Sequence, residues 1–189
     1  MFNNVPILLT WARILLIPIV IGVFYVPQDV LSQHHQNVIA CFVFVVAALT
    51  DWLDGYLART WNQTSNFGAF LDPVADKLMV SAALIALLQL DRCDAFIAFI
   101  IIGREITISA LREWMAKIGA SKGVAVSFIG KLKTTAQMVA IPMLLYRDDL
   151  FSLPILRMGQ VLIVVAAVLT VWSMVYYLRR AAPELKKGT

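Results

Sequence analysis

The chain has 189 residues, of which 60% are hydrophobic and only 15% are charged, and its mean hydropathy is +0.79. Soluble domains average about 45–50% apolar and about 25% charged residues, so this composition argues against a water-soluble globular domain. The formal net charge of +4 is too small and too dispersed for a nucleic-acid-binding protein, but it suits a surface that faces anionic lipid headgroups. We therefore expect an integral membrane protein, with membrane lipids and no nucleic acid among its partners.

Six apolar segments follow one another along the chain. They are Val5–Val26, Val38–Thr50 with an extension past Asp51, Phe67–Leu90, Ala95 to about Trp114, Val124–Tyr146 and Met158–Leu178. A helix needs about 20 such residues to cross about 30 Å of hydrocarbon, and six helices would consume roughly 120 residues. The segments predict an all-α, polytopic bundle of six transmembrane helices in one domain, residues 1–189. No cleavage site follows the first segment, so we expect it to be retained.

Ionisable residues lie at one end of each of the four middle segments. They are Asp51, Asp54, Asp72, Asp76, Lys77, Arg104, Glu105, Arg112, Lys131 and Lys133. In an alternating bundle, the end of an even helix and the start of the next helix lie on the same side, so these charges share one half of the membrane. The opposite connections carry Arg92, Arg147 and Arg157, whereas the remaining 13 of the 16 Lys and Arg residues lie on the charged side. The positive-inside rule therefore predicts that both termini and the charged half face the cytosol.

Four aspartates form the most informative cluster. Asp51 and Asp54 are three residues apart, and Asp72 and Asp76 are four apart, so each pair shares a helical face. Carboxylates gathered near a membrane interior need a compensating cation, and Mg²⁺ or Mn²⁺ prefer oxygen ligands. Two such ions form a clamp for displacement at phosphorus. We expect a site with two Mg²⁺ or Mn²⁺ ions, although acids within a membrane also line ion pathways, so an ion-coupled transporter is the alternative.

The aspartates belong to a longer pattern, D-x2-D-G-x2-A-R-x8-G-x3-D-x3-D. Every specified position is matched, by Asp51, Asp54, Gly55, Ala58, Arg59, Gly68, Asp72 and Asp76. This pattern resembles the signature of the CDP-alcohol phosphotransferase family. Residues 6–13, 103–113 and 130–137 also resemble members of this family that use glycerol-3-phosphate as acceptor. One departure is Ile7, because many members have asparagine three residues before the threonine that is Thr10 here.

The resemblance assigns roles within the pattern. It implies that Asp51, Asp54 and Asp72 bind metal and that Asp76 is the general base, which also contacts the second ion. It further implies that Gly55, Arg59 and a polar residue such as Ser65 hold the CDP group of CDP-diacylglycerol, with Thr10 as an additional candidate. The residues alone predict the metal cluster, but they do not select Asp76 as the base.

Basic residues in the same half indicate an anionic second substrate. Arg104, Arg112, Lys131 and Lys133 are costly to bury without a partner, and a phosphate satisfies several of them at once; for any one of them, a lipid headgroup is the alternative. The resemblance implies transfer of a phosphatidyl group from CDP-diacylglycerol to glycerol-3-phosphate, with Arg112 and Lys133 preferred as phosphate ligands. It also implies a homodimer in the bacterial inner membrane. Inositol phosphate, serine or a second phospholipid stay open as acceptors.

Overall fold

The computed structural model describes residues 5–60, 66–120 and 128–185, and this part of the chain contains six α-helices and no β-strand. The elements are α1 (Val5–Gly22), the short 3₁₀ helix η1 (Val23–Tyr25), α2 (Gln33–Thr60), α3 (Asn66–Gln89), α4 (Ala95–Lys117), α5 (Phe128–Tyr146) and α6 (Ile155–Leu185). Each predicted segment therefore corresponds to a helix. The predicted start of the fifth segment, residues 124–127, lies outside the described residues.

Two helices extend beyond the apolar segments that predicted them. α2 begins at Gln33, before the predicted start at Val38, and so includes polar residues that precede the apolar segment. Ser32 precedes this first turn, where its Oγ lies 2.7 Å from Nδ1 of His35. α6 continues to Leu185, past the predicted end at Leu178. Hydropathy identifies the apolar part of a helix, and it does not detect polar helical turns at the ends of that part.

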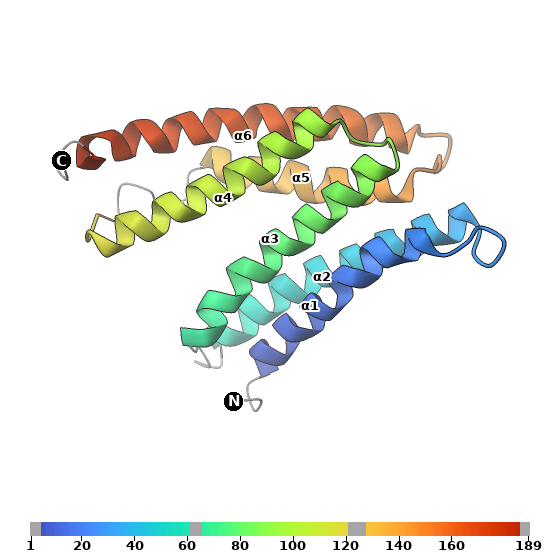
Figure 1. Ribbon diagram of the computed structural model, residues 1–189, viewed down its shortest axis with the longest axis horizontal. Coiled ribbons are helices and arrows are strands. Elements are labelled where there is room, and N and C mark those ends of the chain that lie inside the picture. The colour runs from blue at the N-terminus through green and yellow to red at the C-terminus, as the bar shows by residue number, and fades with distance from the viewer. Residues whose placement is uncertain (1–4, 61–65, 121–127, 186–189) are drawn as a thin grey trace.

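Successive helices alternate in direction, as Figure 1 shows. α1 packs against α2 and α3, α5 packs against α6 and α2, and α4 packs against α6 and α3. The connections before α2, α4 and α6 lie at one end of the molecule, called the connection end below. The end of α2, the start of α3, the end of α4 and the start of α5 lie at the opposite end, called the site end (Figure 1). The predicted convergence of the charged segments is confirmed.

Local signals fix both ends of α4. At its start, the Asp94 side chain accepts a hydrogen bond of 2.7 Å from the backbone N–H of Phe96, a standard N-cap. After its end, Gly119 adopts a φ of +73°, and the Ala120 N–H reaches back to the Met115 carbonyl at 2.8 Å. This is the Schellman arrangement, in which glycine avoids the steric penalty of a positive φ. The chain therefore turns away about two helical turns after Arg112.

The main hydrophobic core draws side chains from all six helices. Alanines recur in it, at Ala40, Ala47, Ala83, Ala140 and Ala167, and they allow close approach of the helices. A smaller cluster of Ile108, Met115, Tyr177 and Ala181 joins α4 to α6. Both cysteines, Cys41 and Cys93, are free thiols.

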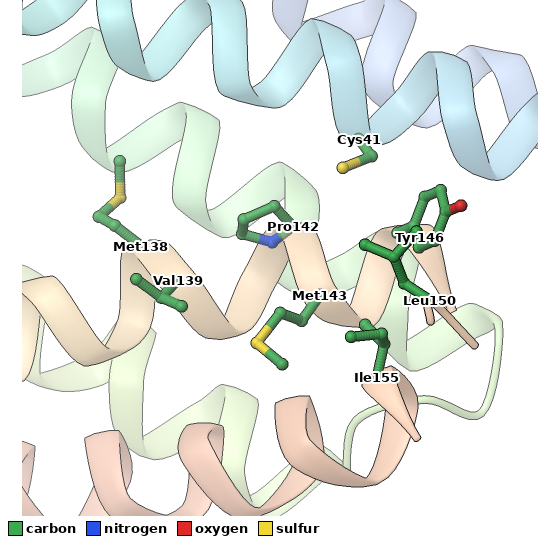
Figure 2. Close-up of a pocket in the computed structure, with 8 residues that line it drawn as sticks. All are labelled: Cys41, Met138, Val139, Pro142, Met143, Tyr146, Leu150 and Ile155. Atoms are coloured by element: carbon green, nitrogen blue, oxygen red, sulfur yellow. The ribbon is translucent and has the colours of Figure 1, made fainter. Parts of the chain in front are cut away.

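Three helices of the described part are long and apolar enough to cross a membrane, over Ile7–Tyr25, Gln33–Leu53 and Ile155–Pro183. Large apolar side chains such as Leu15, Phe42 and Phe99 are exposed on the outside of the bundle. An apolar pocket of about 510 Å³ opens between α2 and α5 (Figure 2), where Cys41 on α2 faces Pro142 on α5. Such surfaces are suited to contact with hydrocarbon chains.

Candidate functional site

Helix α1 holds one aspartate from each of the two neighbouring helices. Arg13 is fully buried, and its Nη1 lies 2.5 Å from Oδ1 of Asp51 on α2. Thr10 is also buried, and its hydroxyl donates a hydrogen bond of 2.6 Å to Oδ1 of Asp72 on α3. Thr10 and Arg13 are three residues apart and so share a face of α1. The structure thus puts Arg13 against the first aspartate of the motif.

Asp76 lines a cavity of about 50 Å³ between α3, α4 and α5. The other lining residues are Lys77, Val80, Glu105, Lys133, Thr134, Gln137 and Met138. Asp76 is close enough to Asp51 and Glu105, and to Arg13 and Lys133, for their charges to act on its carboxylate. The candidate base therefore lies near acids from α2 and α4 and near cations from α1 and α5.

The donor chemistry of the aspartates fits a hard divalent cation, because carboxylate oxygens from α2 and α3 face the same region. Among the residues that the structure describes, no three acidic, histidine or cysteine side chains are grouped closely enough to hold a metal ion. The side chain of Asp54, the remaining aspartate of the motif, lies outside the described residues. Two-ion binding therefore stays a prediction, supported by the type of donor.

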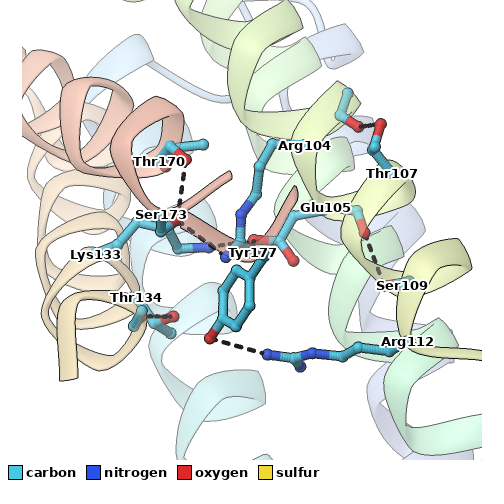
Figure 3. A network of polar contacts seen from close by, with 12 residues as sticks. Arg104, Glu105, Thr107, Ser109, Arg112, Lys133, Thr134, Thr170, Ser173 and Tyr177 are labelled. Carbon is cyan, nitrogen blue, oxygen red and sulfur yellow. Dashed lines mark hydrogen bonds and ion pairs between the residues drawn. The ribbon is translucent and has the colours of Figure 1, made fainter. Parts of the chain in front are cut away.

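A basic cluster from α4 and α5 adjoins the Asp76 cavity (Figure 3). Lys133 is only 3% exposed and forms an ion pair with Glu105. Arg104 Nη1 lies 3.2 Å from Oε1 of the same glutamate, while its Nη2 donates to Ser173 Oγ on α6 at 3.1 Å. Glu105 thus offsets part of the cost of burying two cations, in keeping with the rule that buried charges are paired.

Tyr177 on α6 brings Arg104 and Arg112 together. The guanidinium carbons of these arginines lie 5.8 Å and 5.3 Å from the centroid of its ring, within the range of cation–π attraction. Arg112 Nη2 also donates to the Tyr177 hydroxyl at 3.4 Å (Figure 3). The buried Nε atoms of both arginines find no hydrogen-bond partner among the described residues. Two cations with unused donors are the chemistry of an anion-binding site.

Of the remaining predicted site residues, two are fully described by the structure, whereas the other two lie wholly or partly outside its described part. Gly55 lies on α2 with partial exposure, and Lys131 is exposed on α5, away from the cavity lining. The side chain of Arg59 and the whole of Ser65 lie outside the described residues. The structure thus brings Asp51, Asp72 and Asp76 to one end with Arg104, Arg112 and Lys133, and it leaves Lys131 at the surface.

Four polar residues of the site were not among the predicted site residues: Glu105, Gln137, Ser173 and Tyr177. Glu105 had a usable signal, because an acid within a membrane segment requires a partner and basic residues surround it in the sequence. Ser173 and Tyr177 are four residues apart on α6 and so face the same way, but they occur in a long apolar segment. Only the packing of α6 against α4 shows their contacts.

Comparison with known families accounts for this combination of aspartates and cations. The model of the CDP-alcohol phosphatidyltransferase family matches residues 3–172. The chain belongs to this family, and the resemblance inferred from the motif is confirmed.

Three curated relatives illustrate its similarity to individual members. The chain is 49% identical over 184 residues to the CDP-diacylglycerol–glycerol-3-phosphate 3-phosphatidyltransferase of Escherichia coli (strain K12). It is also 49% identical to the protein of that name from Shigella flexneri serotype 5b (strain 8401) and 48% identical to the one from Salmonella choleraesuis (strain SC-B67). Each alignment covers 96% of this chain and 97% of the relative.

Proposed function

We propose that this protein transfers the phosphatidyl group of CDP-diacylglycerol to glycerol-3-phosphate, giving phosphatidylglycerophosphate and CMP in phospholipid biosynthesis. The observation that carries the proposal is identity of about 49%, over nearly the whole length of both chains, to relatives whose names state these two substrates. The site is consistent with it, because motif aspartates adjoin a basic cluster that suits a phosphate-bearing acceptor.

We further propose that all six helices span the bacterial inner membrane, with both termini and the site end on the cytosolic side. The alternation of helix directions supports this topology, as does the concentration of Lys and Arg residues at one side. Among the described residues, α1, α2 and α6 meet the usual length and hydropathy criteria for a membrane span. Helices α3, α4 and α5 do not meet them, and these helices carry charged residues of the site. A homodimer follows from the family resemblance alone.

In this proposal Asp76 accepts the proton of the acceptor's 1-hydroxyl. The hydroxyl oxygen then forms a bond to the β-phosphorus of CDP-diacylglycerol, and the bond from that phosphorus to CMP breaks. A general base must be within hydrogen-bond reach of the proton it removes. The position of Asp76 in the cavity with Lys133 supports this role, because Lys133 can hold the acceptor's phosphate nearby.

The other aspartates act through their contacts. Two Mg²⁺ or Mn²⁺ ions, held by Asp51, Asp54, Asp72 and Asp76, would supply positive charge that neutralises the pyrophosphate. Arg13 and Thr10 orient Asp51 and Asp72 from α1, so that the carboxylates are preorganised. Gly55, Arg59 and Ser65 are proposed to hold the CDP group at the adjacent end of α2, and Thr10 stays a further candidate for it.

Arg104, Arg112 and Lys133 are proposed to bind the acceptor's phosphate, with Lys131 as an outer contact. Support comes from the unused Nε atoms of the two arginines and from the burial of Lys133. Glu105 holds Lys133 and Arg104 in the structure, so an incoming phosphate has to share these cations with it. Arginine is suited to this task because its planar fork matches two phosphate oxygens.

The proposal is tested by CMP release from purified protein in micelles containing CDP-diacylglycerol and Mg²⁺, with and without glycerol-3-phosphate. Release that requires both the acceptor and the metal is the expected result. Release that ignores glycerol-3-phosphate but responds to inositol phosphate, serine or a second phospholipid would replace the acceptor. If folded protein releases no CMP with any alcohol yet moves ions across liposomes, the transferase proposal is wrong and an ion-coupled transporter replaces it.

A further inference from the structure

Gln137 is a buried polar residue in the Asp76 cavity that the mechanism above does not use. It lies on α5, is only 3% exposed, and lines the cavity together with Asp76 and Lys133. Its Oε1 is buried and has no hydrogen-bond partner among the described residues. Buried side-chain oxygens are nearly always hydrogen-bonded, so an unpartnered one inside a cavity points to a ligand that donates to it.

Apart from Lys77, the other polar groups of the cavity have partners or assigned roles. The Thr134 hydroxyl donates to the Gly130 carbonyl at 3.0 Å, and Glu105 is paired with Lys133. Asp76 is the proposed base. Gln137 is therefore the uncharged group in this lining whose hydrogen-bonding capacity is left for a substrate.

The size of the cavity limits what Gln137 can contact. A cavity needs about 10–15 Å³ to hold one water molecule, so a volume of about 50 Å³ has room for more than one non-hydrogen atom. The space therefore accepts a carbon that bears a hydroxyl. A hydroxyl both donates and accepts, so it satisfies the amide in either of its flipped orientations.

We propose that Gln137 recognises the 2-hydroxyl of glycerol-3-phosphate and so selects a polyol phosphate as acceptor. This inference rests on the proposed function. Lys133 and Gln137 are four residues apart, on one face of α5, about 6 Å along the helix axis. An acceptor with its phosphate at Lys133 then presents its carbon chain to Gln137, while its 1-hydroxyl reaches Asp76 on α3.

The decisive comparison uses an acceptor that lacks only the 2-hydroxyl, 3-hydroxypropyl phosphate, which keeps the phosphate and the attacking hydroxyl. With it, the Gln137 oxygen stays buried and unpaired. We expect kcat/KM of the unaltered protein to be at least about 10-fold lower with this analogue than with glycerol-3-phosphate. Equal use of the two acceptors would overturn the inference.

The Gln137→Met variant assigns the discrimination to this side chain, because methionine has a similar volume and no strong hydrogen-bonding atom. We expect kcat/KM for glycerol-3-phosphate to fall about 10-fold, with little change for 3-hydroxypropyl phosphate and an unchanged KM for CDP-diacylglycerol. The matched control is Gln160→Met, an exposed glutamine near the start of α6 at the connection end, which should keep the full preference.

The outcomes separate the inference from the function on which it rests. A Gln137→Met protein that still prefers glycerol-3-phosphate as strongly as the unaltered protein would overturn the inference alone. No CMP release with glycerol-3-phosphate in the unaltered protein would overturn the proposed function and the inference together. If Gln137→Met does not fold, the same ratio is measured in Gln137→Asn, whose shorter side chain withdraws the amide from the hydroxyl.

Discussion

Two buried arginines, one at the connection end and one beside the candidate site, differ in how many of their hydrogen-bond donors have partners. Arg92, in the connection between α3 and α4, is 3% exposed and has its guanidinium occupied by the chain itself. Its Nη1 donates to the carbonyls of Leu144 and Leu145 at 3.2 Å and 2.8 Å, and its Nη2 donates to Asn37 Oδ1 at 2.7 Å. These contacts cap the end of α5 and tie it to α2.

Arg104, midway along α4 and beside the Asp76 cavity, is also buried, at 6% exposure, but it is incompletely satisfied. It shares Glu105 with Lys133, faces the Tyr177 ring together with Arg112, and leaves its Nε without a partner among the described residues. Arg92 therefore serves stability, because two backbone carbonyls and Asn37 accept hydrogen bonds from its guanidinium. Arg104 serves binding, because a donor is left over. Burial alone does not distinguish the two uses, whereas the count of satisfied donors does.

The largest effect should come from Asp76→Asn, which tests the site end without touching the connection end. Asparagine keeps the shape of the side chain but cannot accept the acceptor's proton, so CMP release should fall at least about 10³-fold. The measurement is initial CMP release at saturating substrates, together with thermal unfolding in detergent. Asp149→Asn, in the exposed connection before α6, is the matched control and should retain activity. Near-normal turnover in Asp76→Asn would contradict the assignment of the base.

Arg112→Met should separate binding from stability. Removing one phosphate ligand should raise KM for glycerol-3-phosphate about 10- to 100-fold and leave KM for CDP-diacylglycerol unchanged. The melting temperature should change little, because the described residues give Arg112 one long hydrogen bond of 3.4 Å and a ring contact. The control is Arg157→Met, an exposed arginine near the start of α6. Equal increases of KM for both substrates would instead indicate a general distortion of the site.

Arg92→Met should show the reverse pattern. It removes three hydrogen bonds from a charged group and leaves the Asn37 oxygen buried, so we expect a loss of about 2–3 kcal/mol in the free energy of unfolding. Burial, followed by the charge of Arg147, lowers the pKa of Arg92 to about 10, which still leaves the guanidinium protonated at neutral pH. Denaturant titration in detergent measures the loss. Kinetic constants of the folded fraction should be unaltered. A change of KM for glycerol-3-phosphate would contradict the claim that Arg92 contributes to stability and not to substrate binding.

The smallest effect concerns Cys93, beside Arg92. Burial, followed by the charge of Asp94, raises the pKa of the Cys93 thiol from 9.0 to about 11. Alkylation at pH 8 should therefore be slow in the folded protein and fast in dodecyl sulfate, and its rate should rise up to about pH 11. Because the folded pKa exceeds the unfolded one, the corresponding stability is full below about pH 9 and is lost as pH rises to about 11. Rapid alkylation at pH 8 in Cys41→Ser protein would contradict the packing of the connection end.

Sequence reasoning reached the helices and the motif because both are local patterns. Apolar length predicted each helix, and the spacing of Asp72 and Asp76 predicted a shared face, since one turn of helix sets both. It placed Glu105 in the charged half but did not predict its pairing with Lys133, because the two residues are 28 positions apart and the pairing depends on how α4 and α5 approach each other. The polar first turn of α2 was missed for a related reason, because hydropathy does not report helix formation in polar segments.

The amino-acid sequence by itself determined that this chain is a helical membrane protein with the aspartate motif of its family, since composition, helical period and motif spacing are properties of neighbouring residues. Only the tertiary structure decided which buried groups have partners. Arg13 contacts Asp51, the Thr10 hydroxyl contacts Asp72, and Arg92 contacts the end of α5. In contrast, the Gln137 oxygen and the Nε atoms of Arg104 and Arg112 have no hydrogen-bond partner among the described residues. These outcomes depend on helix crossings that join residues far apart in the chain, and we assign the Gln137 oxygen and these two Nε atoms to substrate binding.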